Sequence, residues 1–179
     1  MPYLLMILIL LSACAPVKQN RLANQSVCVP IGSEKSPQDL CYLNVDDRDS
    51  YNQRSLFFLV NDFGAERIPA LGDGREVFEL LLSPSRRYAA VVESAGEGHG
   101  IFFVADLDRV RTYKDLHQCP GIEAYPYGFF DLKWHNDILH FSTHVDLLND
   151  SDIETGDEPL PRFNYRLSPA HACHLEIID

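Results

Sequence analysis

The residues with the most obvious chemistry in this sequence are its seven histidines, all of which lie between His99 and His174. Side chains two or four positions apart share one face of a strand. On that basis four residues of two neighbouring predicted strands form a candidate metal site: Asp131, His135, His140 and His144. Imidazole and carboxylate groups suit zinc or another transition metal. Residues four apart on a strand are about 13 Å apart, so a bend is needed to gather them. The alternative is a solvated polar face.

A His-x-Cys spacing occurs twice, in His117–Cys119 and in His171–Cys173, and His174 directly follows the second. Four such side chains make a structural zinc site in a reducing compartment. In an oxidising compartment the cysteines form a disulfide instead. The two interpretations exclude each other, and the disulfide is the one expected of an exported chain.

Apart from Cys14, the chain has four cysteines, an even number that predicts two disulfides in an exported protein. Three pairings are possible. We favour the pairing that keeps each bridge within one half of the chain, which joins Cys28 to Cys41 and Cys119 to Cys173.

An acidic segment from Asp146 to Pro159 contains six acidic residues and no basic one. Within it Asp150, Asp152 and Glu154 alternate, as oxygen ligands of calcium often do, although the spacing departs from that of an EF-hand. The segment is predicted to be a solvated acidic loop, with these three residues as a candidate calcium site.

The glycine cluster GEGHG, residues 96–100, follows a predicted strand. A phosphate-binding loop would continue with Lys, then Ser or Thr, and a helix, whereas here the strand-like IFFVADL follows. The cluster is therefore predicted to be the bend of a hairpin. This places Glu97 and His99 at an exposed tip, where a partner has access to them. Tyr125 and Tyr127, in the aromatic run YPYGFF, are the other candidate contact residues.

The elements that must position these residues are short strands. Apolar runs rich in aromatic and branched residues alternate with turn residues, and none has a sustained helical period. Strands are predicted at 55–61, 76–82, 87–94, 100–107, 129–135, 137–144, 162–167 and 172–178. A helix of one or two turns is predicted at 108–116, and residues 28–41 are predicted to be a disulfide-stapled loop. The chain is therefore predicted to be all-β.

Two segments, LLSPSRRYAAVV with the following FFVADLD, and KWHNDILHF, each repeat a strand, a tight polar turn and a strand. The first resembles a blade of WD40 or TolB-like β-propellers, with Ser83–Arg86 as the turn. The resemblance implies an antiparallel meander of blade-like sheets. Propellers need about four or more blades, and the chain supplies about two. The expected fold is a partial propeller or a sandwich, and a closed propeller would require chains to oligomerise.

The N-terminus carries an apolar run, Leu4 to Leu11, of the length found in signal peptides. It leads into Leu11-Ser12-Ala13-Cys14, which resembles a bacterial lipobox. The resemblance implies a signal peptide over residues 1–13, acylation of Cys14, a tether over 14–27 and one β-rich domain over 28–179. Because Ala15 rather than Asp follows the cysteine, it also implies sorting to the outer membrane, facing the periplasm.

The net charge of −11 disfavours nucleic acid as a partner, because phosphates would be repelled. The sequence has no Gly-x-Ser-x-Gly motif, and two disulfides leave no free thiol for Cys–His catalysis. We therefore expect a lipid-anchored envelope module that binds a protein or glycan and carries no cofactor, with inhibition of a basic target as a more specific version. The alternative is a metal-assisted hydrolase that uses the histidines of the second half.

Overall fold

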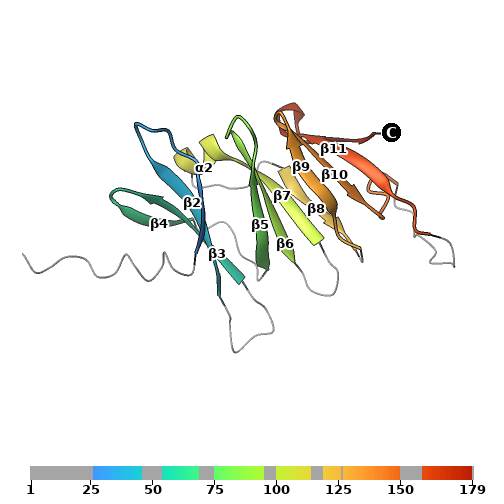
Figure 1. Cartoon of the computed structure of the whole chain (residues 1–179), viewed down its shortest axis with the longest axis horizontal. Helices are drawn as coiled ribbons and strands as arrows, with labels where there is room; N and C mark the ends of the chain where they lie inside the picture. Colours follow the sequence, from blue (N-terminus) through green and yellow to red (C-terminus); the bar gives the residue numbers. More distant parts are fainter. Residues whose placement is uncertain are drawn as a thin grey trace, which may run out of the picture.

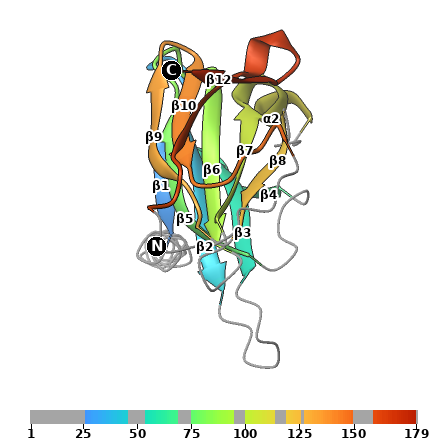
Figure 2. The same cartoon turned by 90° about the vertical axis from the view of Figure 1, so that its right-hand side faces the viewer.

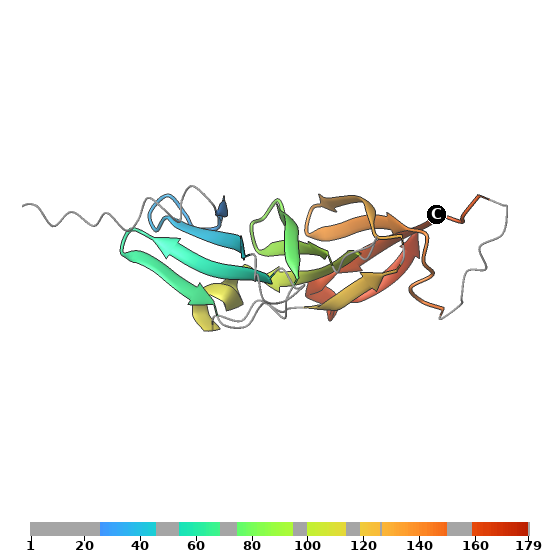
Figure 3. The ribbon, with the colours of Figure 1, turned by 90° about the horizontal axis from the view of Figure 1, so that it is seen from below.

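The computed structural model describes residues 26–45, 54–68, 75–94, 100–113, 119–125, 127–149 and 159–178. In this part of the chain the strands form three four-stranded antiparallel sheets, each a meander of four consecutive strands. The sheets stand in a row, face against face (Figure 1, Figure 3). The prediction of an all-β chain is therefore confirmed. The prediction of about two blades is wrong, because four strands that the sequence did not reveal complete three sheets: Val27–Pro30, Gln38–Val45, Gly64–Ile68 and Cys119–Ala124.

The first sheet contains β1 (Val27–Pro30), β2 (Gln38–Val45), β3 (Arg54–Asn61) and β4 (Gly64–Ile68). The second contains β5 (Glu76–Leu82), β6 (Tyr88–Ser94), β7 (Gly100–Asp106) and β8 (Cys119–Ala124). The third contains β9 (Phe130–His135), β10 (Ile138–Thr143), β11 (Phe163–Ser168) and β12 (His174–Ile178). A short helix, α2 (Leu107–Tyr113), follows β7, and a 3-10 turn, η1 (Pro169–His171), precedes β12.

The middle sheet is apolar on both faces. Along β6 the side chains of Ala89 and Val91 belong to the core shared with the first sheet, whereas Ala90 belongs to the core shared with the third. Along β7 Phe103 and Phe102 divide in the same way. This alternation between two cores explains why these strands are continuous apolar runs in the sequence.

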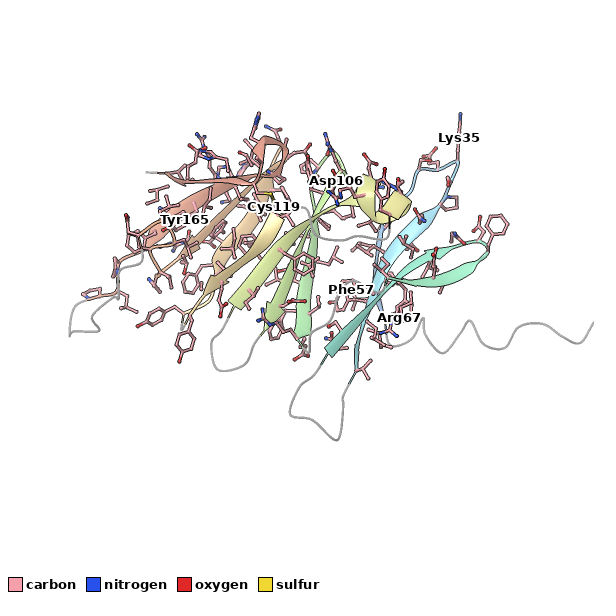
Figure 4. All side chains as sticks on the ribbon, turned by 180° about the vertical axis from the view of Figure 1, so that it is seen from behind. Lys35, Phe57, Arg67, Asp106, Cys119 and Tyr165 are labelled. Carbon is pink, nitrogen blue, oxygen red and sulfur yellow. A yellow bond between two sulfur atoms is a disulfide. The ribbon has the colours of Figure 1, made fainter. Side chains whose placement is uncertain are left out.

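The outer sheets each contribute one face to these cores. The first sheet contributes Leu40, Tyr42, Phe57, Leu59 and Ile68. The third contributes Leu139, Phe141, Tyr165 and Leu167. Figure 4 labels Phe57 and Tyr165, one from each outer sheet. Seen along the row, the strands of the three sheets run in the same general direction, as expected of sheets packed face to face (Figure 2).

Polar contacts also tie the sheets together. The Trp134 Nε1–H of the third sheet donates to the Leu81 carbonyl of the second at 2.9 Å. Between the first and second sheets, the Val77 N–H donates to Ser55 Oγ at 2.9 Å, and Asn44 Nδ2 donates to the Val77 carbonyl at 2.9 Å. Backbone groups of β5 that lack a strand neighbour on that side are thereby satisfied.

The helix α2 begins where β7 ends, because Asp106 caps it. Its carboxylate accepts hydrogen bonds from the backbone N–H groups of Asp108 and Arg109, at 2.9 and 3.3 Å. Leu107 and Val110 are fully buried in the first core. The helix is short, as the sequence predicted, and none of the helices in the described residues is long and apolar enough to cross a membrane.

Two disulfides join the cysteines in the pairing that we favoured from the sequence. Cys28 and Cys41 are directly opposite each other on β1 and β2. The prediction of a stapled loop over 28–41 is therefore wrong, because its two ends are paired strands and only the middle is a turn. The second bond joins Cys119 at the start of β8 to Cys173 next to β12, and it links the second sheet covalently to the third.

The core between the second and third sheets provides a test of the row arrangement. Phe102 is fully buried and packs edge to face against Phe129 and Phe141, with ring centroids 4.8 and 4.9 Å apart. We expect Phe102→Ala to lower the free energy of unfolding by about 3–5 kcal/mol. Phe63→Ala is the matched control, since Phe63 is 99% exposed, and its effect should stay within about 0.5 kcal/mol. Similar urea midpoints for the two variants would contradict the arrangement.

Candidate functional site

The candidate site lies where the chain passes from the second sheet to the third. The turn between β8 and β9 is closed by a hydrogen bond from the Gly128 N–H to the Ala124 carbonyl at 3.1 Å. Gly128 has a φ of 67°, a conformation that favours glycine. Tyr125 and Tyr127, both predicted as contact residues, lie on this turn.

The His144 ring contacts the rings of Tyr127 and Phe130 at this turn. Together with Tyr125, which lies on the same turn, these residues are called here the aromatic cluster: Tyr125, Tyr127, Phe130 and His144. The His144 ring meets Tyr127 edge to face at a centroid distance of 5.6 Å and Phe130 at 5.0 Å. His144 Nδ1 lies 2.6 Å from the Pro161 carbonyl oxygen. Because that oxygen can only accept, Nδ1 carries the proton, and Nε2 of the neutral ring is an acceptor.

The cluster is accessible to a partner. Tyr125 is 60% exposed and Phe130 is 37% exposed, while Tyr127 and His144 are partly buried. Apolar rings with phenol and imidazole groups at their edges combine stacking area with hydrogen bonding, which is the composition of many protein and glycan contact surfaces. Phe130 and His144 were not among the candidate contact residues of the sequence. The only sequence signal for Phe130 was its place at the end of the aromatic run.

The segment that carries Glu97 and His99 starts and ends beside this cluster. Both residues lie outside the described residues, but the segment leaves β6 at Ser94 and returns at Gly100. A Cβ at Gly100 would lie 3.0 Å from the Cα of Gly128 and 3.0 Å from the Phe129 ring. The start of β7 is therefore packed against the turn that holds Tyr125 and Tyr127, at the same edge of the sheets (Figure 1).

The predicted metal site does not form. The described residues contain no group of three or more His, Cys, Asp or Glu side chains placed to hold a metal ion. His135 and His140 do meet across the β9–β10 hairpin, with ring centroids 4.6 Å apart. His144, in contrast, follows the end of β10 and turns into the aromatic cluster. The prediction assumed two regular strands, and the actual pairing shifts register between His140 and Ser142.

Asp131 forms an ion pair with an arginine and joins no group of metal-ligating side chains in the described part of the chain. It adopts a φ of 52°, outside the range of a regular strand, and pairs with Arg162, which also donates to Ser142 Oγ at 3.1 Å. These three side chains and His140 line a hollow of about 250 Å³ on the outer face of the third sheet. The pKa of His140 is lowered, first by burial and then by the positive charge of His135, Arg166 and Lys133.

The other predicted ligands have separate outcomes. The zinc alternative of the His-x-Cys repeats is excluded in this structure, because Cys119 and Cys173 are bonded to each other. The candidate calcium residues Asp150, Asp152 and Glu154 lie outside the described residues, as does Cys14.

A second feature that the sequence did not reveal is a hydrogen-bond network around Tyr165, whose side chain is fully buried. Its hydroxyl accepts from the Leu147 N–H at 2.8 Å and lies 3.3 Å from Asp146 Oδ1. The Asp146 carboxylate also accepts from the Leu148 and Asn149 backbone and, at 2.9 Å, from Asn149 Nδ2. This hydrogen-bond network holds residues 145–149, which follow His144, against the third sheet.

Comparison with known proteins gives a likeness of fold alone. No protein-family model and no curated protein matches the sequence. Among solved structures, the uncharacterized protein lmo1340 from Listeria monocytogenes EGD-e matches with a TM-score of 0.51 and 13% identity, over 87% of this chain and 40% of that one. The Pyrococcus horikoshii acylaminoacyl peptidase matches with a TM-score of 0.43 and 11% identity, over 87% of this chain and 25% of that one. The chain therefore spans less than half the length of either protein.

The hydrogen-bond network around Asp146 and Tyr165 predicts a loss of stability in acid. The Asn149 side-chain hydrogen bond, followed by backbone N–H donors, lowers the pKa of Asp146 below its ordinary 3.8. The folded chain therefore holds this proton less tightly than the unfolded chain, so the stabilisation is complete above pH 3.8 and is lost as the pH falls through the folded-state pKa. We expect Asp146→Asn to flatten this part of the stability profile, measured as urea midpoints from pH 7 downward. Asn149→Ala should return the NMR titration midpoint of Asp146 toward 3.8, and an unchanged midpoint would contradict the assignment.

Proposed function

We propose that this protein is a lipid-anchored module of the bacterial cell envelope that binds a protein or a glycan through the aromatic cluster and catalyses no reaction itself. The anchor would be the acylated Cys14, and the module would face the periplasm from the outer membrane. The proposal joins the lipobox-like sequence at the N-terminus to the exposed rings at the β8–β9 turn.

The exposed aromatic cluster is the observation that carries the binding role. Tyr125 and Phe130 are exposed to solvent, and buried or disulfide-linked elements hold the turn from both sides. A rigid aromatic surface loses little conformational entropy when it binds, and tyrosine is enriched among the residues that dominate binding energy. Sugar rings and peptide side chains are both suited to such a surface.

The charge of the chain favours a basic protein among the two partner classes. With a net charge of −11, the module would attract a cationic enzyme or peptide over long distances and repel anionic ones. An inhibitor of a basic, lysozyme-like hydrolase is the specific version of the proposal that this charge supports.

A metal-assisted hydrolase finds less support. That alternative needed Asp131, His140 and His144 to converge, and each instead belongs to a different set of contacts.

The anchor is tested by replacing the acylated cysteine. We expect Cys14→Ser to abolish incorporation of radiolabelled palmitate and to shift the protein from the outer-membrane fraction to other fractions. Cys28→Ser is the matched control, because it removes a cysteine that forms a disulfide. Unchanged palmitate labelling of the Cys14→Ser variant would disprove the anchor. That result would not bear on the proposed binding surface.

The binding surface is tested with two defined probes, purified peptidoglycan sacculi and lysozyme. Tyr125→Ala combined with Tyr127→Ala should raise the dissociation constant for the bound probe by about tenfold or more. Tyr113→Ala is the matched control, because Tyr113 is 74% exposed on α2 and lies away from the cluster. An equal effect of the control, or no binding of either probe by the unmodified chain, would count against the proposal.

A further inference from the structure

The first sheet has a second apolar face. One of its faces belongs to the core shared with the middle sheet, and the other, called here the outer face, points away from the row (Figure 3). Strand alternation and register place five partly exposed apolar side chains on the outer face: Leu43, Val45, Leu56, Phe58 and Val60. None of the five belongs to either of the two cores formed by the described residues.

The opposite end of the row is polar. The outward-pointing residues of the third sheet pair across its strands as Lys133 with His140, His140 with Arg166, and Arg166 with Glu176. Arg166 and Glu176 also form an ion pair. A polar outer face is what the terminal unit of a stacked array needs in order to remain soluble. The third sheet therefore ends the row, and the first sheet does not end it in the same way.

The sequence of β3 makes the same distinction. Its apolar run Leu56–Val60 is continuous, as in β6 and β7 of the middle sheet, which are buried on both faces. By contrast, β10 alternates apolar and polar residues, as expected of a strand with one face in water. The first sheet thus has the residue pattern of an interior sheet although it stands at one end.

We propose that the outer face of the first sheet binds the same face of a second copy of this chain. The two central strands of this face are eight residues long and its edge strands four and five, so the face covers roughly 400 Å² in plan at standard strand spacings. Side-chain relief adds to this plan area, so the contact would belong to the smaller protein interfaces, below the ~800 Å² per partner of the standard size. Two copies would form one continuous row of sheets that ends in a polar third sheet on each side.

Charges at the two sides of the outer face select the symmetry axis. Asp39 lies on β2, and Arg67 lies on the edge strand β4, where it pairs in register with Phe58. Closed dimers use a two-fold axis. An axis parallel to the strands lays β4 of each copy over β1 of its partner, which places Arg67 one strand spacing across the sheet and two residues along it from the partner's Asp39. An axis across the strands would instead oppose β4 to β4 and Arg67 to Arg67.

The entry point of the chain favours the same axis. The strand β1 starts at Val27, on the side of the sheet where β2 ends. An axis parallel to the strands preserves this direction, so both copies receive their N-terminal segments at the same end of the dimer. This step rests on the proposed lipid anchor, because two anchors in one membrane require both tethers to leave the dimer on one side.

The dimer is tested on the full chain in mild detergent, with the protein mass measured by light scattering. We expect a dimer for the unmodified chain. Phe58→Glu should raise the dissociation constant by about 100-fold or more, because it would bury a charged carboxylate among the apolar side chains at the centre of the interface. Asn164→Glu, on the outer face of the third sheet, is the matched control and should remain dimeric. A monomeric unmodified chain, or a dimer disrupted only by Asn164→Glu, would overturn the proposal.

A charge exchange tests the axis and is independent of how well any one variant folds. Asp39→Arg and Arg67→Asp should each weaken the dimer, because each places like charges opposite one another. Mixing the two variants should restore it as a heterodimer, since both contacts then become attractive. Circular dichroism verifies the fold of each variant. Failure of the mixture to associate better than either variant alone would overturn the proposed axis. The outcome of the palmitate-labelling experiment does not affect the outcome of this one. The proposed anchor and the proposed dimer can therefore be disproved independently of each other.

Discussion

The middle sheet must be covered on both faces, and the rest of the structure follows from that constraint. Its strands β6 and β7 alternate side chains between two cores, so neither face can be exposed without a large loss of hydrophobic free energy. The small residues Ala89, Ala90 and Ala105 leave room for the large rings of the neighbouring sheets. Placing one sheet on each side is the simplest solution, and it fixes the order of the three meanders.

The two junctions between sheets are secured differently, which bears on where a site can be built. Between the second and third sheets a disulfide, the Trp134 hydrogen bond and several edge-to-face ring contacts all act together. The β8–β9 turn crosses this junction, so its exposed rings are carried by a well-fixed frame. The first and second sheets are joined by the apolar core and by the hydrogen bonds around Val77.

Much of this fold can be predicted from the sequence, and the errors have identifiable causes. Residues 76–82 were predicted as a strand with the bounds that β5 has, because apolar runs bounded by turn residues are a strong signal. The strands β4 and β8 were missed because GAERI and CPGIEA contain the glycine and proline that usually mark turns, yet both are edge strands that tolerate them. The metal prediction failed because periodicity cannot reveal a register shift, nor the arrival of Arg162 from a distant part of the chain. Tyr125 and Tyr127 were chosen as candidate contact residues because they belong to a local aromatic run, whereas His144 joins this turn only through tertiary structure.

The Cys28–Cys41 bond has a mechanical consequence. In the first sheet β1 is an edge strand paired only with β2. A force that pulls on the chain before Val27 acts on the free end of this strand and would peel its hydrogen bonds away one at a time. Cys28 is the second residue of β1, so peeling meets a covalent bond after a single residue. The load then passes to β2, which is hydrogen-bonded on both sides. The staple thus makes the first sheet resistant to tension applied from the N-terminal side.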